Sequence, residues 1–199
     1  KHEEFIEKGN EVLLALAGDV RRGMLVLFTS RGHLHRSYYE LRGALTRKGI
    51  TLLGQGIDGS RNLLLRRFRE ETSSVLFGTD SFWEGVDVPG SALELVVIMR
   101  LPFAVPTEPI IQAQMEEIER AGGQPFMDFT VPEAAIKLRQ GAGRLIRHRS
   151  DRGAVVVFDT RVITTRYGSV FRRCLPGSEM RVENVERLID SMKKWFGDK

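Results

Sequence analysis

The chain has 199 residues, of which 42% are hydrophobic and 28% are charged, a balance typical of a folded globular protein. This composition excludes a disordered chain, and no apolar run has the length that a membrane span requires. Lys and Arg number 30 against 26 Asp and Glu, an excess of positive charge that permits nucleic-acid binding without requiring it.

Cysteine and histidine usage argues against a metal centre in this chain. Cys174 is the single cysteine, which rules out an internal disulfide and a four-cysteine zinc or iron–sulfur site. His33, His35 and His148 do not cluster by spacing, so we expect no metal site. The first residue is Lys1 and no signal peptide is recognisable, so we expect a cytoplasmic fragment of a longer protein.

Five short apolar runs in the sequence predict strands. Uninterrupted runs of Val, Leu and Ile are typical of strands buried on both faces, and helices between them serve as crossovers of a parallel sheet. The pattern predicts one α/β domain over residues 1–199, with a mostly parallel sheet flanked by helices. The predicted strands cover residues 24–28, 50–53, 75–77, 95–99 and 155–158.

Six longer segments between or beside these runs predict helices. Two of them carry start signals: Thr107 precedes Glu108 and Pro109, and Thr130 is followed by Glu133 at capping-box spacing. The predicted helices cover residues 3–17, 32–48, 60–71, 108–121, 133–147 and 182–195.

The most informative motif is the octet at residues 140–147, which places Gln140, Arg144 and Arg147 late in a predicted helix. On an α-helix these side chains would fall within an arc of about 60° and span about 10 Å. Two guanidinium groups aimed the same way favour a phosphate ligand, because arginine pairs bidentately with phosphate oxygens and keeps its charge. The alternative is a solvated basic helix face.

Two glycines interrupt the same octet. Gly141 and Gly143 each cost a helix interior about 1 kcal/mol relative to alanine, so helix formation does not explain them. Close approach of another backbone or of a ligand would explain them.

Polar residues follow the predicted strands directly. In open parallel sheets ligands gather beyond the carboxyl ends of the strands, so these positions are candidate sites, although strand ends commonly meet polar loops. The segments in question are residues 29–31, 78–81, 100–103 and 159–161.

The stretch at residues 78–90 is dense in glycine, hydroxyl and carboxylate groups, which suits binding of sugar hydroxyls or phosphates. Asp87 can accept a ribose hydroxyl, and Thr79 can donate to a nucleic-acid phosphate. The alternative makes Asp80 a helix cap and Trp83 a core residue.

A G-x-G-x-x-G pattern at residues 54–59 lies between a predicted strand and a helix, the context of a dinucleotide-binding fingerprint. It follows the second apolar run, and the acidic residue expected about 20 positions later would fall in the Asp80 turn. A glycine-rich turn capped by Asp58 or Ser60 explains the pattern equally well.

The sequence contains no G-x-x-x-x-G-K-[S/T] phosphate loop and no obvious acidic pair for magnesium. An arginine pair without a phosphate loop suggests half of a site. We therefore expect the chain to supply arginine fingers to a nucleotide that another domain holds.

The order and spacing of these motifs resemble the second motor domain of superfamily-two helicases, in detail the DinG branch of the DinG/XPD-like DNA helicases. The resemblance covers about residues 10–175 and implies a RecA-like three-layer α/β fold. Residues 27–30 resemble motif IV, residues 79–87 motif V and residues 140–147 motif VI.

The resemblance implies specific roles for several residues. Arg144 and Arg147 would be arginine fingers, and Asp159 with Arg161 resembles a charged pair that follows motif VI in these proteins. The implied nucleotide contacts are Gln140, Gly143, Glu84, Gly85 and Asp87. The implied contacts to single-stranded DNA are Ser30, Arg31, Thr79, Arg100 and Phe103.

By the same resemblance, the full-length parent would be an ATP-dependent DNA helicase of DNA repair that moves 5′ to 3′ along single-stranded or forked DNA. ATP and Mg²⁺ would be shared with an absent first motor domain, and an iron–sulfur cluster, where present, would belong to the parent. The isolated chain should not hydrolyse ATP. The alternatives are a non-catalytic nucleic-acid-binding or partner-docking domain with a motor-like fold, and a dinucleotide-binding enzyme built on residues 54–59.

Overall fold

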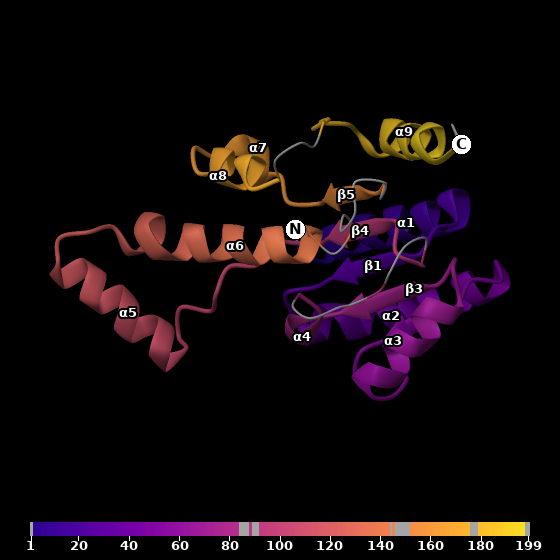
Figure 1. Ribbon diagram of the computed structural model, residues 1–199, viewed down its shortest axis with the longest axis horizontal. Coiled ribbons are helices and arrows are strands. Elements are labelled where there is room, and N and C mark those ends of the chain that lie inside the picture. The colour runs from indigo at the N-terminus through magenta and orange to yellow at the C-terminus, as the bar shows by residue number, and fades with distance from the viewer. Residues whose placement is uncertain are drawn as a thin grey trace.

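A computed structural model describes residues 2–83, 88, 92–143, 145, 152–175 and 179–197. Its centre is a five-stranded, all-parallel sheet with the strand order β2-β3-β1-β4-β5 (Figure 1). All five predicted strands and the α/β fold class are confirmed. The strands are β1 (Met24–Leu27), β2 (Leu52–Gly54), β3 (Val75–Gly78), β4 (Leu95–Ile98) and β5 (Ala154–Val157).

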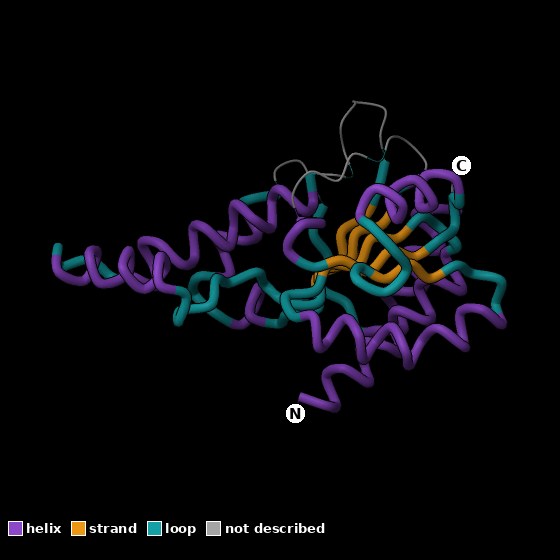
Figure 2. The backbone as a smooth tube through the Cα atoms, turned by 90° about the horizontal axis from the view of Figure 1, so that it is seen from below, coloured by secondary structure: helices purple, strands orange, loops and turns teal. Residues whose placement is uncertain are grey.

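Helices cover both faces of the sheet (Figure 2). All six predicted helices are present, and the short helices α4, α7 and α8 were not predicted. The helical elements are α1 (His2–Val20), α2 (Arg31–Arg47), α3 (Arg61–Glu70), α4 (Asp80–Trp83), α5 (Pro109–Arg120), the π-helix η2 (Phe126–Thr130), α6 (Val131–Ala142), α7 (Arg161–Thr164), α8 (Gly168–Arg173) and α9 (Val185–Gly197). No helix in this described part combines the length and hydropathy that crossing a bilayer requires.

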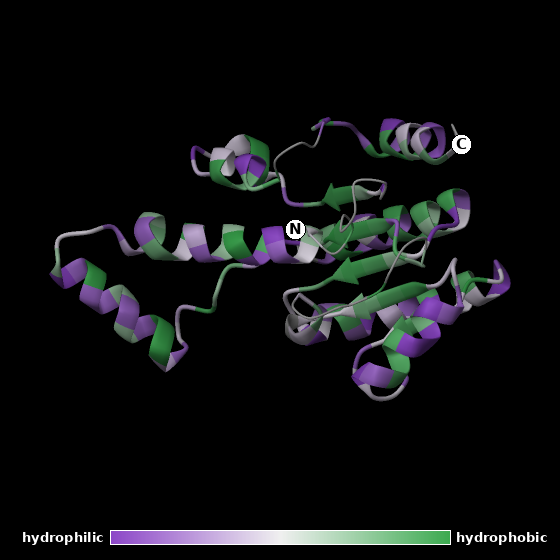
Figure 3. Ribbon diagram, viewed as in Figure 1, coloured by the Kyte–Doolittle hydropathy of each residue, from purple (hydrophilic) through white to green (hydrophobic). Residues whose placement is uncertain are grey.

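The sheet divides the core into two layers because successive strand residues face opposite sides. In β1, Met24 and Val26 join the cluster under α1, α2 and α9, whereas Leu25 and Leu27 join the cluster under α3, α4, α6 and α8. All four side chains are at most 1% exposed. Strands buried on both faces read as continuous apolar runs, and Figure 3 shows them as the hydrophobic centre of the molecule.

The predicted C-terminal boundary, at residue 147, of the helix expected over residues 133–147 is wrong. α6 ends at Ala142 with Gly143 as its C-cap, and the Gly143 N–H donates to the Arg139 carbonyl over 2.8 Å. The Leu145 N–H then donates to the Ala142 carbonyl over 3.1 Å, a tighter turn that closes the helix end. α6 therefore ends within the octet, where two glycines weaken the helix.

The predicted capping box at Thr130 does not form. Thr130 already has helical backbone angles, φ −64° and ψ −42°, and makes no side-chain cap. Its hydroxyl lies 3.5 Å from the Pro125 carbonyl instead. The π-helix η2 therefore runs directly into α6, and the turn that opens η2 is braced by Asp128, which accepts the Gln124 N–H at 2.7 Å.

Residues 104–136 form an arm that projects beyond the sheet (Figures 1 and 2). It contains α5, η2 and the first turn of α6, and α5 buries none of its residues. The arm is acidic in a chain that is otherwise basic. Its charged residues are Glu108, Glu116, Glu117, Glu119, Arg120, Asp128 and Glu133.

Gly141 is the point of closest packing between α6 and the sheet. A Cβ atom at this position would lie 2.9 Å from both Leu27 Cδ1 and Trp83 Cε3. The sequence predicted close approach of another backbone or of a ligand at this glycine, and the structure shows instead that two side chains pack against it.

Gly141→Ala should lower the free energy of unfolding by about 1–3 kcal/mol, because overpacking outweighs the gain in helix propensity. The matched control is Gly43→Ala in α2, where a Cβ would meet only the Arg47 guanidinium at 3.6 Å. That variant should be neutral or stabilised by up to about 1 kcal/mol. Urea denaturation of both variants measures the difference, and equal stabilisation would contradict the packing argument.

Candidate nucleotide and nucleic-acid interface

All five strands of the sheet point the same way, so their carboxyl ends form a single edge. We call the residues that directly follow each strand its exit. Along this edge the exits follow the spatial order of the strands: Gln55 after β2, Thr79 after β3, Ser30 after β1, Arg100 after β4 and Asp159 after β5. Residues from five distant parts of the sequence therefore lie along one line.

The exits of β2 and β3 are joined by the Gln55 side chain. Gln55 Oε1 accepts the Thr79 N–H at 2.6 Å and the Thr79 hydroxyl at 3.1 Å, and Gln55 Nε2 donates to Ser81 Oγ at 3.1 Å. Thr79 is 2% exposed. Its hydroxyl is thus held within the domain, and its predicted DNA contact stays a prediction.

The glycine-rich turn at residues 54–59 closes on its own aspartate. Asp58 accepts the Gly54 N–H at 2.7 Å and the Tyr38 hydroxyl at 2.9 Å. Gly56 and Gly59 have φ values of 76° and 122°, a region that favours glycine. Burial, and then the hydrogen bond to Asp58, raises the pKa of Tyr38 to about 12. The interpretation of the pattern as a capped turn is confirmed.

The segment that follows β1 contains a backbone carbonyl held by a buried tryptophan, and then the exposed N-terminus of α2. Trp83 is buried and its Nε1–H donates to the Phe28 carbonyl at 3.2 Å, so its interpretation as a core residue is confirmed. Ser30 is the N-cap of α2, and its Oγ accepts the His33 N–H at 3.4 Å. Arg31 is exposed, and the first turn of α2 contains no acidic residue. The positive end of α2 therefore suits an anionic group.

The loop after β4 carries two of the predicted DNA contacts, Arg100 and Phe103. The Arg100 guanidinium lies 4.4 Å from the centre of the Phe5 ring on α1. The Phe103 ring lies within 6.0 Å of the rings of Phe126, Tyr167 and Phe171. Phe103 is only partly buried, so one side of this aromatic cluster reaches the surface.

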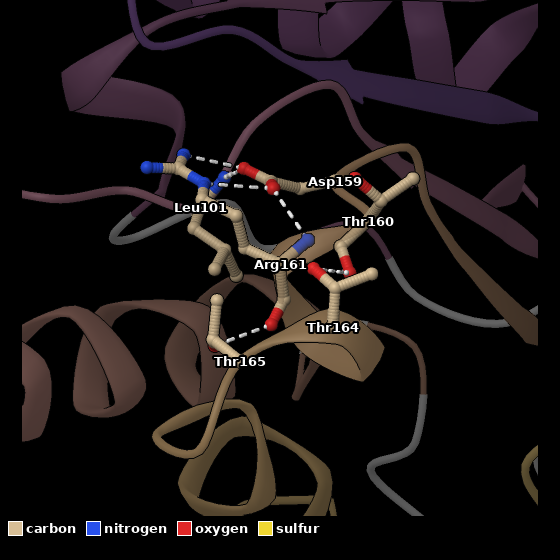
Figure 4. Close-up of polar contacts among 6 residues, drawn as sticks. All are labelled: Leu101, Asp159, Thr160, Arg161, Thr164 and Thr165. Carbon is tan, nitrogen blue, oxygen red and sulfur yellow. Dashed lines mark hydrogen bonds and ion pairs between the residues drawn. The ribbon is translucent and has the colours of Figure 1, made fainter.

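Asp159 joins the exits of β5 and β4 (Figure 4). Its Oδ2 accepts the Leu101 N–H at 3.0 Å, and its Oδ1 accepts the Arg161 N–H at 3.1 Å and Arg161 Nε at 2.9 Å. Burial by itself would raise the pKa of the Asp159 carboxyl, but the hydrogen bonds from Arg161 and Leu101 outweigh it and hold the pKa below its usual 3.8. The carboxylate is therefore charged and fully engaged at neutral pH.

The exposed end of α6 borders a shallow hollow of about 390 Å³. Its lining residues are Ile136, Arg139, Gln140 and Gly143. Two of the predicted nucleotide contacts, Gln140 and Gly143, thus share one surface, and Gly141 beside them packs on Leu27 at the carboxyl end of β1. Arg139 also lines this hollow, and the sequence did not single it out because it is one of many arginines and lies outside the octet.

Several predicted site residues lie outside the described residues, and their roles stay predictions. They are the two arginine fingers Arg144 and Arg147 and the nucleotide contacts Glu84, Gly85 and Asp87.

Comparisons with known proteins show which family the chain is similar to. Residues 13–178 match the family described as the helicase C-terminal domain. An ATP-dependent DNA helicase YoaA from Haemophilus influenzae is 40% identical over 94% of this chain and 26% of its own length. A 3'-5' exonuclease DinG from Bacillus subtilis is 38% identical over 96% of this chain and 21% of its own length.

Solved structures show the same fold. A structure titled XPD_Helicase aligns with a TM-score of 0.64 at 20% identity, over 89% of this chain and 32% of that chain. The structure of S. tokodaii Xpd4 aligns with a TM-score of 0.58 at 18% identity, over 84% of this chain and 32% of that chain. These structures thus share the fold of this chain, a parallel sheet with helices on both faces.

The chain belongs to the helicase C-terminal domain family. The resemblance to the DinG branch is confirmed by relatives that carry the names DinG and YoaA. The chain spans about a quarter of the length of these relatives.

Asp159→Asn should lower the free energy of unfolding by about 2–3 kcal/mol at neutral pH, because the carboxylate charge that Arg161 and the Leu101 N–H stabilise is lost. The folded pKa lies below the unfolded value near 3.8. This contribution is therefore complete above about pH 5, begins to decrease near the unfolded pKa and is lost as the pH falls through the lower folded pKa. Urea denaturation of both proteins between about pH 7 and pH 2 should show their stabilities converging.

A matched control is Glu179→Gln, because Glu179 pairs with Arg181 at the same two-residue separation but on an exposed surface. This variant should change stability by less than about 0.5 kcal/mol. A stability difference for Asp159→Asn that does not vary with pH would show that the carboxylate charge contributes nothing.

Proposed function

We propose that this chain is the second motor domain of an ATP-dependent DNA helicase and supplies arginine fingers and part of the track for single-stranded DNA. The observation that carries the proposal is the position of the motif VI segment. Gln140 and Gly143 line one surface at the end of α6, and Gly141 between them packs on the end of β1. This is the edge of the sheet at which α/β domains bind ligands.

The domain would hold only one side of the nucleotide. Its sequence has no phosphate loop, so the triphosphate and its Mg²⁺ would bind mainly to a first motor domain elsewhere in the parent. Arg144 and Arg147 would approach the phosphates from the opposite side, with Gln140 beside them. Because Cys174 is the single cysteine, an iron–sulfur cluster in the parent would need ligands from outside this chain.

ATP would then act as a bridge between two domains. The charge contacts between its phosphates and the arginine fingers favour closure, and hydrolysis weakens them, so the nucleotide state biases the closed form. If the affinity for DNA differs between the closed and the open form, repeated closing and opening would produce 5′ to 3′ steps along a single strand.

The charge distribution favours a DNA path over the exits of β1 and β4. The N-terminus of α2 with Arg31 offers backbone N–H groups and a cation, and Arg100 lies on the next exit. The arm at residues 104–136 carries six carboxylates and one arginine, so it repels phosphates. The strand would therefore run across the sheet edge rather than along the arm.

One relative is named as an exonuclease. Because this chain spans 21% of that protein, we assign any nuclease activity of a parent to another part of it. A cytoplasmic location and a role in DNA repair stay predictions.

In the full-length parent, Arg144→Ala should lower ATP turnover by on the order of 10³ and leave ATP affinity nearly intact, as for other arginine fingers. Steady-state hydrolysis at saturating single-stranded DNA and calorimetric ATP binding measure the two effects. The control is Arg120→Ala, an exposed arginine on the arm, which should hydrolyse ATP normally. Normal turnover in Arg144→Ala would remove this residue from the finger role.

Arg31→Ala should weaken binding of single-stranded DNA and reduce the slope of log affinity against log salt by about 0.7, the value for one lost phosphate contact. Arg47→Ala is a matched control, because Arg47 is equally exposed but lies in the last turn of the same helix, at the opposite edge of the sheet. Fluorescence anisotropy with a labelled oligonucleotide at several salt concentrations measures both. Identical slopes for the two variants would place the DNA elsewhere.

A further inference from the structure

Two residues that follow β5, Asp159 and Arg161, contact the loop that follows β4 at two points. We call this pair of contacts the clasp. The Asp159 carboxylate accepts the backbone N–H of Leu101 at 3.0 Å, in a buried hydrogen bond. The Arg161 guanidinium lies 5.0 Å from the centre of the Phe103 ring. Two residues of one short segment thus hold both the backbone and a side chain of another.

The two clasping residues are themselves bound to each other. Arg161 Nε lies 2.9 Å from Asp159 Oδ1, and Arg161 Nη2 lies 2.5 Å from Asp159 Oδ2. The side chain of Asp159 is 7% exposed. This bidentate pairing compensates the charge of Arg161 and leaves the face of its guanidinium on Phe103. Arg161 is therefore suited to orienting Phe103 and poorly suited to holding a phosphate.

The clasp determines how the chain leaves the sheet. Between its two points, the Phe103 N–H donates to the Leu101 carbonyl at 2.9 Å, which turns the chain tightly at Pro102. Arg100 lies one residue before the first point and extends over Phe5. Asp159 thus fixes the backbone next to Arg100, and Arg161 contacts the ring of Phe103, so the pair acts beside both predicted DNA contacts of this loop.

Pairing of β4 and β5 does not need the clasp. Four register pairs from Leu95 to Ile98 already join the two strands, and all of them precede the loop. The clasp therefore constrains the exit loop specifically, beyond what the sheet itself provides.

We propose that Asp159 and Arg161 are positioning residues for single-stranded DNA binding, an inference that rests on the proposed function. They hold Arg100 and Phe103 in the arrangement that grips the strand, and they act through Leu101 and Phe103 rather than by touching DNA or ATP.

The test uses the full-length parent and the conservative variant Arg161→Lys, which keeps the charge but loses the bidentate fork and the planar face. The DNA concentration that gives half-maximal ATPase stimulation should rise roughly tenfold. The turnover at saturating DNA and the KM for ATP should not change. Asp159→Asn should show the same pattern, and the exposed-pair control Arg181→Lys should match the wild type.

A double-variant cycle separates positioning from general destabilisation. If Arg161 acts through Phe103, the effects of Arg161→Lys and Phe103→Leu on DNA affinity should not add, because either change alone already disorders the same contact. Additive effects would overturn the proposal. A loss of thermal stability with normal DNA affinity in Arg161→Lys would also overturn it, because the pair would then have a structural role only.

The outcomes separate this inference from the proposed function. Weakened DNA binding in Arg100→Ala and Phe103→Leu, with normal binding in Arg161→Lys, would reject the positioning role and keep the DNA track. Normal binding in Arg100→Ala and Phe103→Leu would remove this loop from the track, and the clasp would lose its role with it. The Arg144→Ala measurement tests the motor function independently of both results.

Discussion

At the end of each strand of a parallel sheet, backbone N–H and C=O groups no longer have partners on the neighbouring strand. Where these groups are buried, they must form hydrogen bonds with other groups. In this protein the partners are side chains from adjacent strand exits. Gln55 binds Thr79, Trp83 binds the Phe28 carbonyl and Asp159 binds the Leu101 N–H. These contacts join β2 to β3, α4 to β1 and β5 to β4. In the described part of the carboxyl edge, neighbouring strand ends are therefore linked by side-chain hydrogen bonds.

The polar residues of this edge fall into two groups. Some, which we call braces, form hydrogen bonds within the domain, and others are exposed and are candidate ligand contacts. The polar side-chain atoms of Thr79, Asp58 and Asp159 form hydrogen bonds within the domain. The start of α2 and the end of α6 instead present exposed groups, at Arg31 and at Gln140. A domain that closes on a nucleotide and grips DNA needs both kinds of residue, because a contact on a loose support loses binding energy to ordering.

The fold was largely predictable because its signals are local. Buried strands require continuous apolar runs, and all five runs became strands in the expected parallel sheet. Boundaries were less predictable. The end of α6 depended on how Gly143 and Leu145 close the last turn, and its start depended on the π-helix that precedes it. The two glycines weaken the helix, but the sequence alone did not show at which of them it ends, and the pattern of Thr130 and Glu133 favoured a capping box over a π-helix.

Residue types and their order were sufficient to predict the α/β class, the candidate edge and the family, since periodicity and motif spacing are properties of the chain itself. The tertiary structure alone decided which polar residues serve as braces. Gln55 and Thr79 are 24 positions apart in the sequence, and Leu101 and Asp159 are 58 positions apart, and only the strand order brings them together. Hydrogen bonds depend on positions in space, and sequence spacing does not determine those positions between strands that are joined by long crossovers.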